Sequence, residues 1–97
     1  LIDTAGTLKA AAEAVRDAGA KRIYAAATHG VFSGNAWENL AAANFERIVV
    51  TDTLPLPPEA PDNVTVLSCA DLHTNSIRQI FTDGSVSDVF GGENQLF

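Results

Sequence analysis

The stretch IYAAATHGVFSGNAWENLAAANFERIVVT, residues 23–51, decides the fold class. It begins with a short apolar run at residues 23–27 and ends with the β-branched run at residues 48–51, and both runs are typical of buried strands. Residues 36–43 lie between them and carry apolar side chains at helical spacing. A strand, a helix and a second strand in this order predict a right-handed βαβ unit with parallel strands.

The same alternation continues on both sides of this unit. Apolar residues recur every three or four positions from Thr7 to Ala18, and Gly19 follows as a helix stop. Val64 to Ser68 predicts a further strand, and Asp71 to Asp83 predicts a further helix. The fold class is therefore α/β, a parallel sheet with flanking helices that we expect to cover both faces. The inward face of the last helix would carry Leu72, Ile77, Ile80 and Phe81.

The remaining segments predict loops and helix ends. Ser33 is an expected N-cap for the helix at residues 36–43. All four prolines fall between Thr53 and Pro61, which predicts an irregular surface loop. Residues 85–90 predict one short turn, and residues 91–95 a frayed tail.

Composition limits the classes of function. Six basic and twelve acidic residues give a net charge of −6, which argues against a nucleic-acid surface because phosphate backbones need clustered Lys and Arg. No apolar run approaches the roughly 18 residues of a membrane span, and no signal peptide is visible, so a cytoplasmic location is expected. The single cysteine, Cys69, is interpreted as a small residue buried in a strand. Leu1-Ile2 resembles the end of a strand, which suggests one domain over residues 1–97 that is incomplete at its N-terminus.

The most informative motif is Asp3-Thr4-Ala5-Gly6-Thr7, which joins a strand end to a helix start. The first amides of a helix have no intrahelical acceptors and lie at the positive end of its dipole, so they can bind a phosphate dianion. Gly6 would allow close approach and a positive φ, while the hydroxyls of Thr4 and Thr7 would add donors. Asp3 would repel a phosphate, so it is expected to accept hydrogen bonds from sugar hydroxyls or to orient the loop. The alternative is that Asp3 or Thr4 simply caps the helix.

Other residues near the ends of predicted strands could contact a ligand or could have a purely structural role. His29 and Asp52 follow the strands at residues 23–27 and 48–51, where ligands of parallel sheets bind. The structural alternative for His29 is a ring nitrogen hydrogen-bonded to the backbone, and for Asp52 it is a cap of the turn. No other potential metal ligand stands at a matching spacing from His73. Trp37 is expected in the core or in a subunit contact.

Four segments extend the evidence beyond the loop. Leu1 to Thr7 resembles the second half of the phosphoribosyl pyrophosphate signature of type I phosphoribosyltransferase folds, a Rossmann-like arrangement. Residues 27–36 (ATHGVFSGNA), 49–55 (VVTDTLP), 66–72 (VLSCADL) and 85–90 (SVSDVF) resemble successive motifs of the ribose-phosphate diphosphokinase family. These motifs stand in register and cover nearly the whole chain.

This resemblance implies transfer of the diphosphoryl group of Mg-ATP to ribose 5-phosphate, giving phosphoribosyl pyrophosphate and AMP. It implies that Asp3, Thr4, Ala5, Gly6 and Thr7 hold ribose 5-phosphate, and that ATP and Mg²⁺ are bound by residues upstream of Leu1. The chain alone is then expected to have no catalytic residue, no metal site and no activity. Homo-oligomers, as dimers or a hexamer, are expected, with no nucleic-acid or membrane partner. The alternatives are a catalytically silent regulatory relative and a phosphoribosyltransferase fragment.

The resemblance also implies a regulatory site for phosphate or ADP at Ser85, Ser87 and Phe90. A helix cap, a turn hydroxyl and a core aromatic are the structural alternatives for these three residues. The chain departs from the family here, because Asp83-Gly84 stands where Gly-Glu is frequent and Phe81 where His is common.

Overall fold

The computed structural model describes residues 1–91 and divides the chain into two compact units, Leu1–Leu67 and Ser68–Phe97. The first unit holds a sheet and two helices, α1 (Gly6–Asp17) and α2 (Ala36–Ala43). The second holds the helix α3 (Ala70–Phe81) and the short 3-10 helix η1 (Val86–Phe90). Within residues 1–91, none of the helices has the length and hydrophobicity of a transmembrane span.

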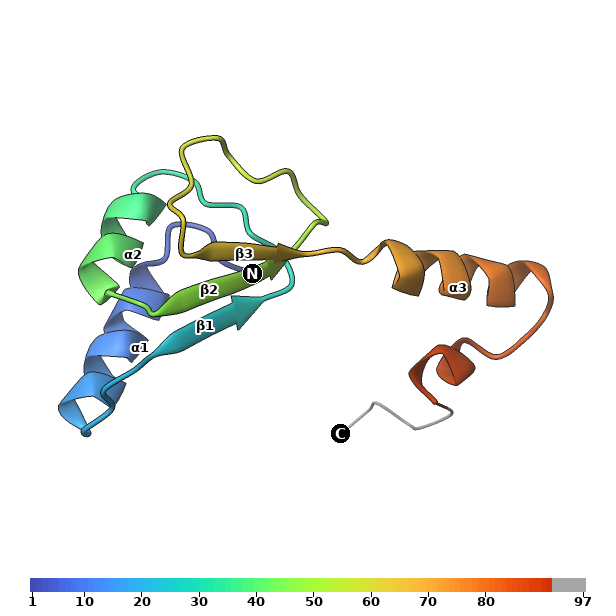
Figure 1. Cartoon of the computed structure of the whole chain (residues 1–97), viewed down its shortest axis with the longest axis horizontal. Helices are drawn as coiled ribbons and strands as arrows, with labels where there is room; N and C mark the ends of the chain where they lie inside the picture. The colour runs from blue at the N-terminus through green and yellow to red at the C-terminus, as the bar shows by residue number, and fades with distance from the viewer. Residues whose placement is uncertain (92–97) are drawn as a thin grey trace. The chain divides into compact units, whose positions relative to one another are not determined.

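The sheet has three parallel strands in the order β1-β2-β3 (Figure 1). They are β1 (Tyr24–Ala27), β2 (Arg47–Thr51) and β3 (Val64–Leu67). In the register of the ladder, Ile48 lies opposite Ala25 on one side and Val64 on the other. The predicted parallel α/β arrangement is therefore confirmed, with each predicted element displaced by no more than two residues at an end.

The core lies between one face of this sheet and the helices α1 and α2. Small side chains allow close packing, since Ala12 of α1 and Ala36 and Ala43 of α2 are at most 2% exposed. Ile48, at the centre of the sheet, is 1% exposed. The buried cluster consists of Ile2, Ala5, Ala12, Ile23, Ala25, Phe32, Ala36, Leu40, Ala43, Phe45, Ile48 and Val50.

The two faces of the sheet differ within this unit. Ala25, Ile48 and Val50 point into the core, whereas the alternate residues Tyr24 and Ala26 are exposed and Val49 is half-buried. Both helices of residues 1–67 therefore cover the same face, and our expectation of cover on both faces is not met in this unit. The connections explain the result, because the segment that joins β2 to β3, residues 52–63, contains no helix that could cover the other face.

The helices α1 and α2 pack side by side (Figure 1), and the Arg16 side chain of α1 reaches the end of α2. Arg16, in the last turn of α1, donates from Nη1 to the carbonyl of Ala43 at 2.9 Å and from Nη2 to that of Asn44 at 3.3 Å. Near the other end, the Asn39 side chain of α2 reaches Thr4, just ahead of α1. The helices are therefore parallel, and both begin near the carboxyl end of the sheet.

The predictions for Trp37 and for the proline-containing loop are both confirmed in this unit. Trp37 packs against the core and stacks on Phe32, with ring centroids 4.4 Å apart and ring planes 23° apart. The proline-containing segment from Thr53 to Pro61 contains neither helix nor strand.

Two predictions are wrong in the second unit. No residue of α3 is buried, and Ile77, Ile80 and Phe81 are 54%, 65% and 84% exposed, so the expectation that they point inward is wrong for the described residues. The physical reason is that within residues 68–91 the helix contacts only η1, which is too short to cover it. Cys69 is the half-buried N-cap of α3, not a buried strand residue, because β3 ends at Leu67. The predicted tail at residues 91–95 falls almost entirely outside the described residues.

Candidate functional site at the start of the first helix

The loop before α1 begins beside the carboxyl end of β1. The Ile2 amide donates to the His29 carbonyl at 2.9 Å, and the Val31 amide donates to the Ile2 carbonyl at 2.8 Å. Ile2 thus forms a parallel bridge with Gly30, three residues after β1 ends. The next residues, from Asp3 onward, leave the sheet at its carboxyl edge, where parallel sheets bind ligands.

The first amides of α1 have no protein partner from a capping side chain. Ala5 occupies the N-cap position without a side-chain cap hydrogen bond, and the first helical bond runs from the Lys9 amide to the Ala5 carbonyl at 2.9 Å. The amides of Gly6, Thr7 and Leu8 precede that bond, and Gly6 and Thr7 are exposed. The alternative in which Asp3 or Thr4 caps the helix is therefore wrong.

Ala5, and not Gly6, adopts the left-handed conformation. Its φ is 64° and its ψ is 15°, values that a residue with a Cβ atom seldom adopts. Gly6 has no positive φ, and a Cβ atom added there would meet no heavy atom within 4 Å. The contribution of Gly6 is therefore open space above the backbone, which allows a ligand to approach its amide.

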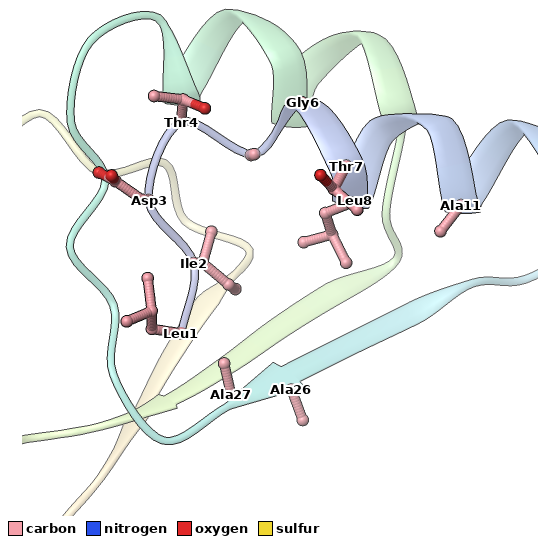
Figure 2. Close-up of a pocket in the computed structure, with 11 residues that line it drawn as sticks. Leu1, Ile2, Asp3, Thr4, Gly6, Thr7, Leu8, Ala11, Ala26 and Ala27 are labelled. Carbon is pink, nitrogen blue, oxygen red and sulfur yellow. The ribbon is translucent and has the colours of Figure 1, made fainter.

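A cavity of about 380 Å³ lies against this loop (Figure 2). Figure 2 shows Leu8 pointing from α1 toward Ala26 and Ala27 of β1, whereas Asp3 and Thr4 project on the side of the loop away from these two residues. The cavity thus combines an apolar wall with a polar rim. Its lining is Leu1, Ile2, Asp3, Thr4, Ala5, Gly6, Thr7, Leu8, Ala11, Ala26 and Ala27.

Two residues from the neighbourhood of α2 hold the loop. The Ser33 hydroxyl donates a hydrogen bond to Oδ1 of Asp3, and Nδ2 of Asn39 donates to the Thr4 carbonyl at 2.8 Å. The N-cap of α2 is Asn35, so the prediction that Ser33 caps this helix is wrong. Asn39 was not singled out in the sequence because an asparagine inside a helix carries no signal of the distant carbonyl that it meets.

A cluster of hydroxyl groups lies at the carboxyl ends of β1 and β2. Thr51 donates from Oγ1 to the Thr28 carbonyl at 2.6 Å, and Nδ1 of His29 lies 2.7 Å from Oγ1 of Thr53. His29 therefore bonds to a side chain, not to backbone as expected. The Asp52 amide donates to the Leu67 carbonyl at 3.1 Å, which places Asp52 in the turn after β2. Hydrogen bonds thus join the loop before α1 to residues 28–33, and join residue 28 to the end of β2.

The residues of the expected regulatory site lie in the second unit. The Ser85 and Ser87 hydroxyls are 2.6 Å apart and both residues are exposed. Ser85 is the N-cap of η1 but makes no side-chain cap bond, and Phe90 is 44% exposed. The cap alternative fits the position of Ser85 but not its side-chain bonding, and the core alternative for Phe90 finds no support in the described residues.

Acidic, histidine and cysteine side chains do not gather in the described part of the chain. Within residues 1–91 there is no group of three or more of them that could hold a metal ion. His73 lies exposed on α3.

Comparison with known proteins connects this geometry to a family. Residues 1–91 match the model of the phosphoribosyl synthetase-associated domain. The chain is 50% identical over 91 residues to a ribose-phosphate pyrophosphokinase of Bifidobacterium longum, covering 93% of this chain and 27% of that protein. It is 52% identical over 91 residues to the ribose-phosphate pyrophosphokinase of Caldanaerobacter subterraneus subsp. tengcongensis, covering 93% of this chain and 29% of that protein.

A solved structure gives the same result for the fold. The chain is similar to the crystal structure of phosphoribosylpyrophosphate synthetase from Mycobacterium smegmatis, with a TM-score of 0.79 and 43% identity over 86% of this chain and 28% of that one. The chain thus spans less than a third of the length of these relatives. We conclude that the chain belongs to the phosphoribosyl synthetase-associated domain family and is homologous to part of ribose-phosphate pyrophosphokinase.

Proposed function

We propose that this chain supplies the ribose 5-phosphate loop of a ribose-phosphate pyrophosphokinase. The observation that carries the proposal is the set of uncapped, exposed amides at the start of α1, beside a cavity, in a chain of this family. The proposed ligand contacts are Asp3, Thr4, Ala5, Gly6 and Thr7. In the whole protein this loop would hold ribose 5-phosphate while the diphosphoryl group of ATP is transferred to it, giving phosphoribosyl pyrophosphate and AMP.

Electrostatics supports a phosphate held by dipoles in place of cations. The chain has a net charge of −6, so its overall field repels an anion. The amides of Gly6 and Thr7 provide local donors, and the partial positive charge of the helix start adds to their attraction. Binding the sugar phosphate in this way would position one of two substrates, which lowers the entropic barrier of a bimolecular transfer. Charge stabilisation by Mg²⁺ would come from residues outside this chain.

The polar side chains of the loop have distinct proposed roles. The hydroxyls of Thr4 and Thr7 would donate to phosphate oxygens. Asp3 already accepts a hydrogen bond from Ser33, which suits a carboxylate that orients the loop and offers its remaining lone pairs to sugar hydroxyls. No residue of the chain is proposed to take part in bond making or breaking.

Binding to the isotopically labelled 97-residue chain tests the proposal. Ribose 5-phosphate should shift the amide signals of Gly6 and Thr7 in a saturable manner, whereas ribose, which lacks the phosphate, should leave them unchanged. Inorganic phosphate should shift the same amides at higher concentration because it lacks the sugar contacts. A lack of any shift at these amides, or an equal response to ribose, would contradict the proposed function.

Catalysis provides a separate test. With ATP, Mg²⁺ and ribose 5-phosphate, the chain alone should release no AMP above background. Steady turnover would show that the chain holds catalytic groups that we have not assigned.

A second proposal concerns the regulatory site at Ser85, Ser87 and Phe90. Two hydroxyl groups 2.6 Å apart could both turn toward one anionic oxygen, next to an exposed aromatic ring. ADP should then shift the amide signals of residues 85–90 in the wild type and not in a Ser85→Ala/Ser87→Ala variant. An equal response of the two proteins would refute this site.

A further inference from the structure

The peptide group between Thr4 and Ala5 is held by a side chain of α2. Its carbonyl, that of Thr4, accepts a hydrogen bond from Nδ2 of Asn39 at 2.8 Å. The Ala5 amide belongs to the same planar peptide group and points the opposite way. The bond from Asn39 therefore sets the direction of the Ala5 amide and turns the Thr4 carbonyl away from it.

This peptide orientation carries backbone strain. Ala5 has a φ of 64°, a conformation that costs a residue with a Cβ atom free energy relative to a negative φ. Rotation of the Thr4–Ala5 peptide by half a turn would relieve that strain, since it changes mainly ψ of Thr4 and φ of Ala5. It would also point the Thr4 carbonyl, with its negative end, where the amide had been. Among the described residues, the side-chain hydrogen bond that opposes this rotation comes from Asn39.

Asn39 is well placed to resist such a rotation because its helix is anchored in the core. The neighbouring residue Leu40 is 3% exposed, and Ala36 and Ala43 are completely buried. The Asn39 amide is itself bonded to the Asn35 carbonyl at 3.1 Å, as a regular part of α2. The side chain therefore extends from a rigid helix to a strained loop 35 residues earlier in the sequence.

We propose that Asn39 is a positioning residue that holds the Thr4–Ala5 peptide in the orientation required for phosphate binding by the loop. Asn39 touches no substrate in this proposal and acts through the backbone of Thr4 and Ala5. The inference rests on the proposed function, because it assigns a task to Asn39 only if the loop binds a phosphate ester. It differs from that function in predicting a conformational effect that is measurable without any ligand.

The test compares Asn39→Ala with a matched control. Alanine is the best helix former, so α2 should remain intact. Asn35→Ala is the control, because Asn35 lies one turn earlier on the same helix and its side chain makes no cap bond. Ribose 5-phosphate binding by the wild type and the two variants is followed through the Gly6 and Thr7 amide signals. The Asn39→Ala variant should bind roughly three- to tenfold more weakly, as expected for loss of one hydrogen bond, and the control should match the wild type.

The ligand-free readout separates positioning from general stability. The wild type should show the strong contact between the amide proton and α-proton of Ala5 that a left-handed residue gives, and Asn39→Ala should lose it while Asn35→Ala keeps it. Should Asn39→Ala fail to give a folded spectrum, Asn39→Asp keeps the size of the side chain, removes the donor and provides the same comparison against Asn35→Asp. Equal affinity and an unchanged Ala5 signal in the Asn39 variant would overturn the inference while leaving the proposed function standing. Failure of the wild type to bind ribose 5-phosphate would instead refute the proposed function, and the assigned role with it.

Discussion

The two ends of the α1–α2 pair differ in how their backbone groups are satisfied. At the carboxyl ends, Arg16 donates to the carbonyls of Ala43 and Asn44, and the Asn44 amide bonds back to the carbonyls of Leu40 and Ala41. At the amino ends, neither helix has a side-chain cap. A helix end without such partners needs another source of hydrogen bonds.

This contrast separates stability from binding. The carboxyl end uses donors from the chain itself, so its contacts contribute to the free energy of unfolding. The amino end of α1 leaves donors exposed beside a cavity, so in our proposal its contacts contribute to the free energy of ligand binding. Mutations at the two ends should therefore have different and partly opposite effects, and the following experiments test that separation.

The largest effect is expected from Gly6→Asp at the amino end. The new carboxylate has room, because a Cβ atom at Gly6 meets nothing within 4 Å and the φ of Gly6 is not positive. A negative charge in the first turn of a helix stabilises it by about 0.3–1 kcal/mol, so the thermal midpoint should rise slightly. The same charge lies close to the proposed phosphate and should weaken ribose 5-phosphate binding by roughly 2–4 kcal/mol.

The sign of these two changes makes the Gly6→Asp experiment decisive. Thermal unfolding and titration with ribose 5-phosphate measure them on the same sample. Gly6→Ala is the uncharged control: its methyl group fills part of the open space, so the further loss of affinity in Gly6→Asp measures the effect of the charge. Unchanged binding by Gly6→Asp would mean that the ligand does not lie at the start of α1.

A smaller effect, on stability and not on ligand binding, is expected from Arg16→Ala at the carboxyl end. Arg16 is half-buried and makes two charge-assisted hydrogen bonds, so their loss should lower the free energy of unfolding by about 1–2 kcal/mol. Affinity for ribose 5-phosphate should change less than twofold, because the loop lies at the other end of the helix pair. Denaturant unfolding checks the first value, with Arg22→Ala as a control that removes an exposed arginine. Equal stability of the two variants would show that Arg16 does not hold the two helix ends together.

Periodicity in the sequence was sufficient to predict the elements of the first unit. The run Ile48-Val49-Val50 could only be a buried strand, and small residues between Asp3 and Thr7 indicated a tight turn into a helix. The parallel sheet was predicted from the alternation of strands and helices, because a helix between two strands returns the chain to the edge at which the first strand began.

The details of the loop could not be predicted in the same way. Local propensity assigns a positive φ to glycine, so Gly6 was the expected position, yet Ala5 adopts it. Contacts distant in sequence decide this, among them the bond from Asn39 to Thr4 and the burial of Ala5 at 6% exposure. The pattern of α3 likewise identified an apolar stripe but carried no information on what covers it.

The smallest effect, and the finest test of the comparison, is expected from Thr7→Val. Valine keeps the shape of threonine and removes only the hydroxyl, for which no protein partner is described and which is exposed. The free energy of unfolding should therefore change by less than about 0.5 kcal/mol. If the hydroxyl donates to the phosphate, affinity for ribose 5-phosphate should fall by about 1 kcal/mol, which is roughly fivefold. Ser76→Ala provides the control, since Ser76 bonds to the Leu72 carbonyl within α3 and lies in the other unit. A loss of affinity in Thr7→Val without a loss of stability would place the hydroxyl among the ligand contacts, whereas a loss of stability without a loss of affinity would make Thr7 a structural residue like Arg16.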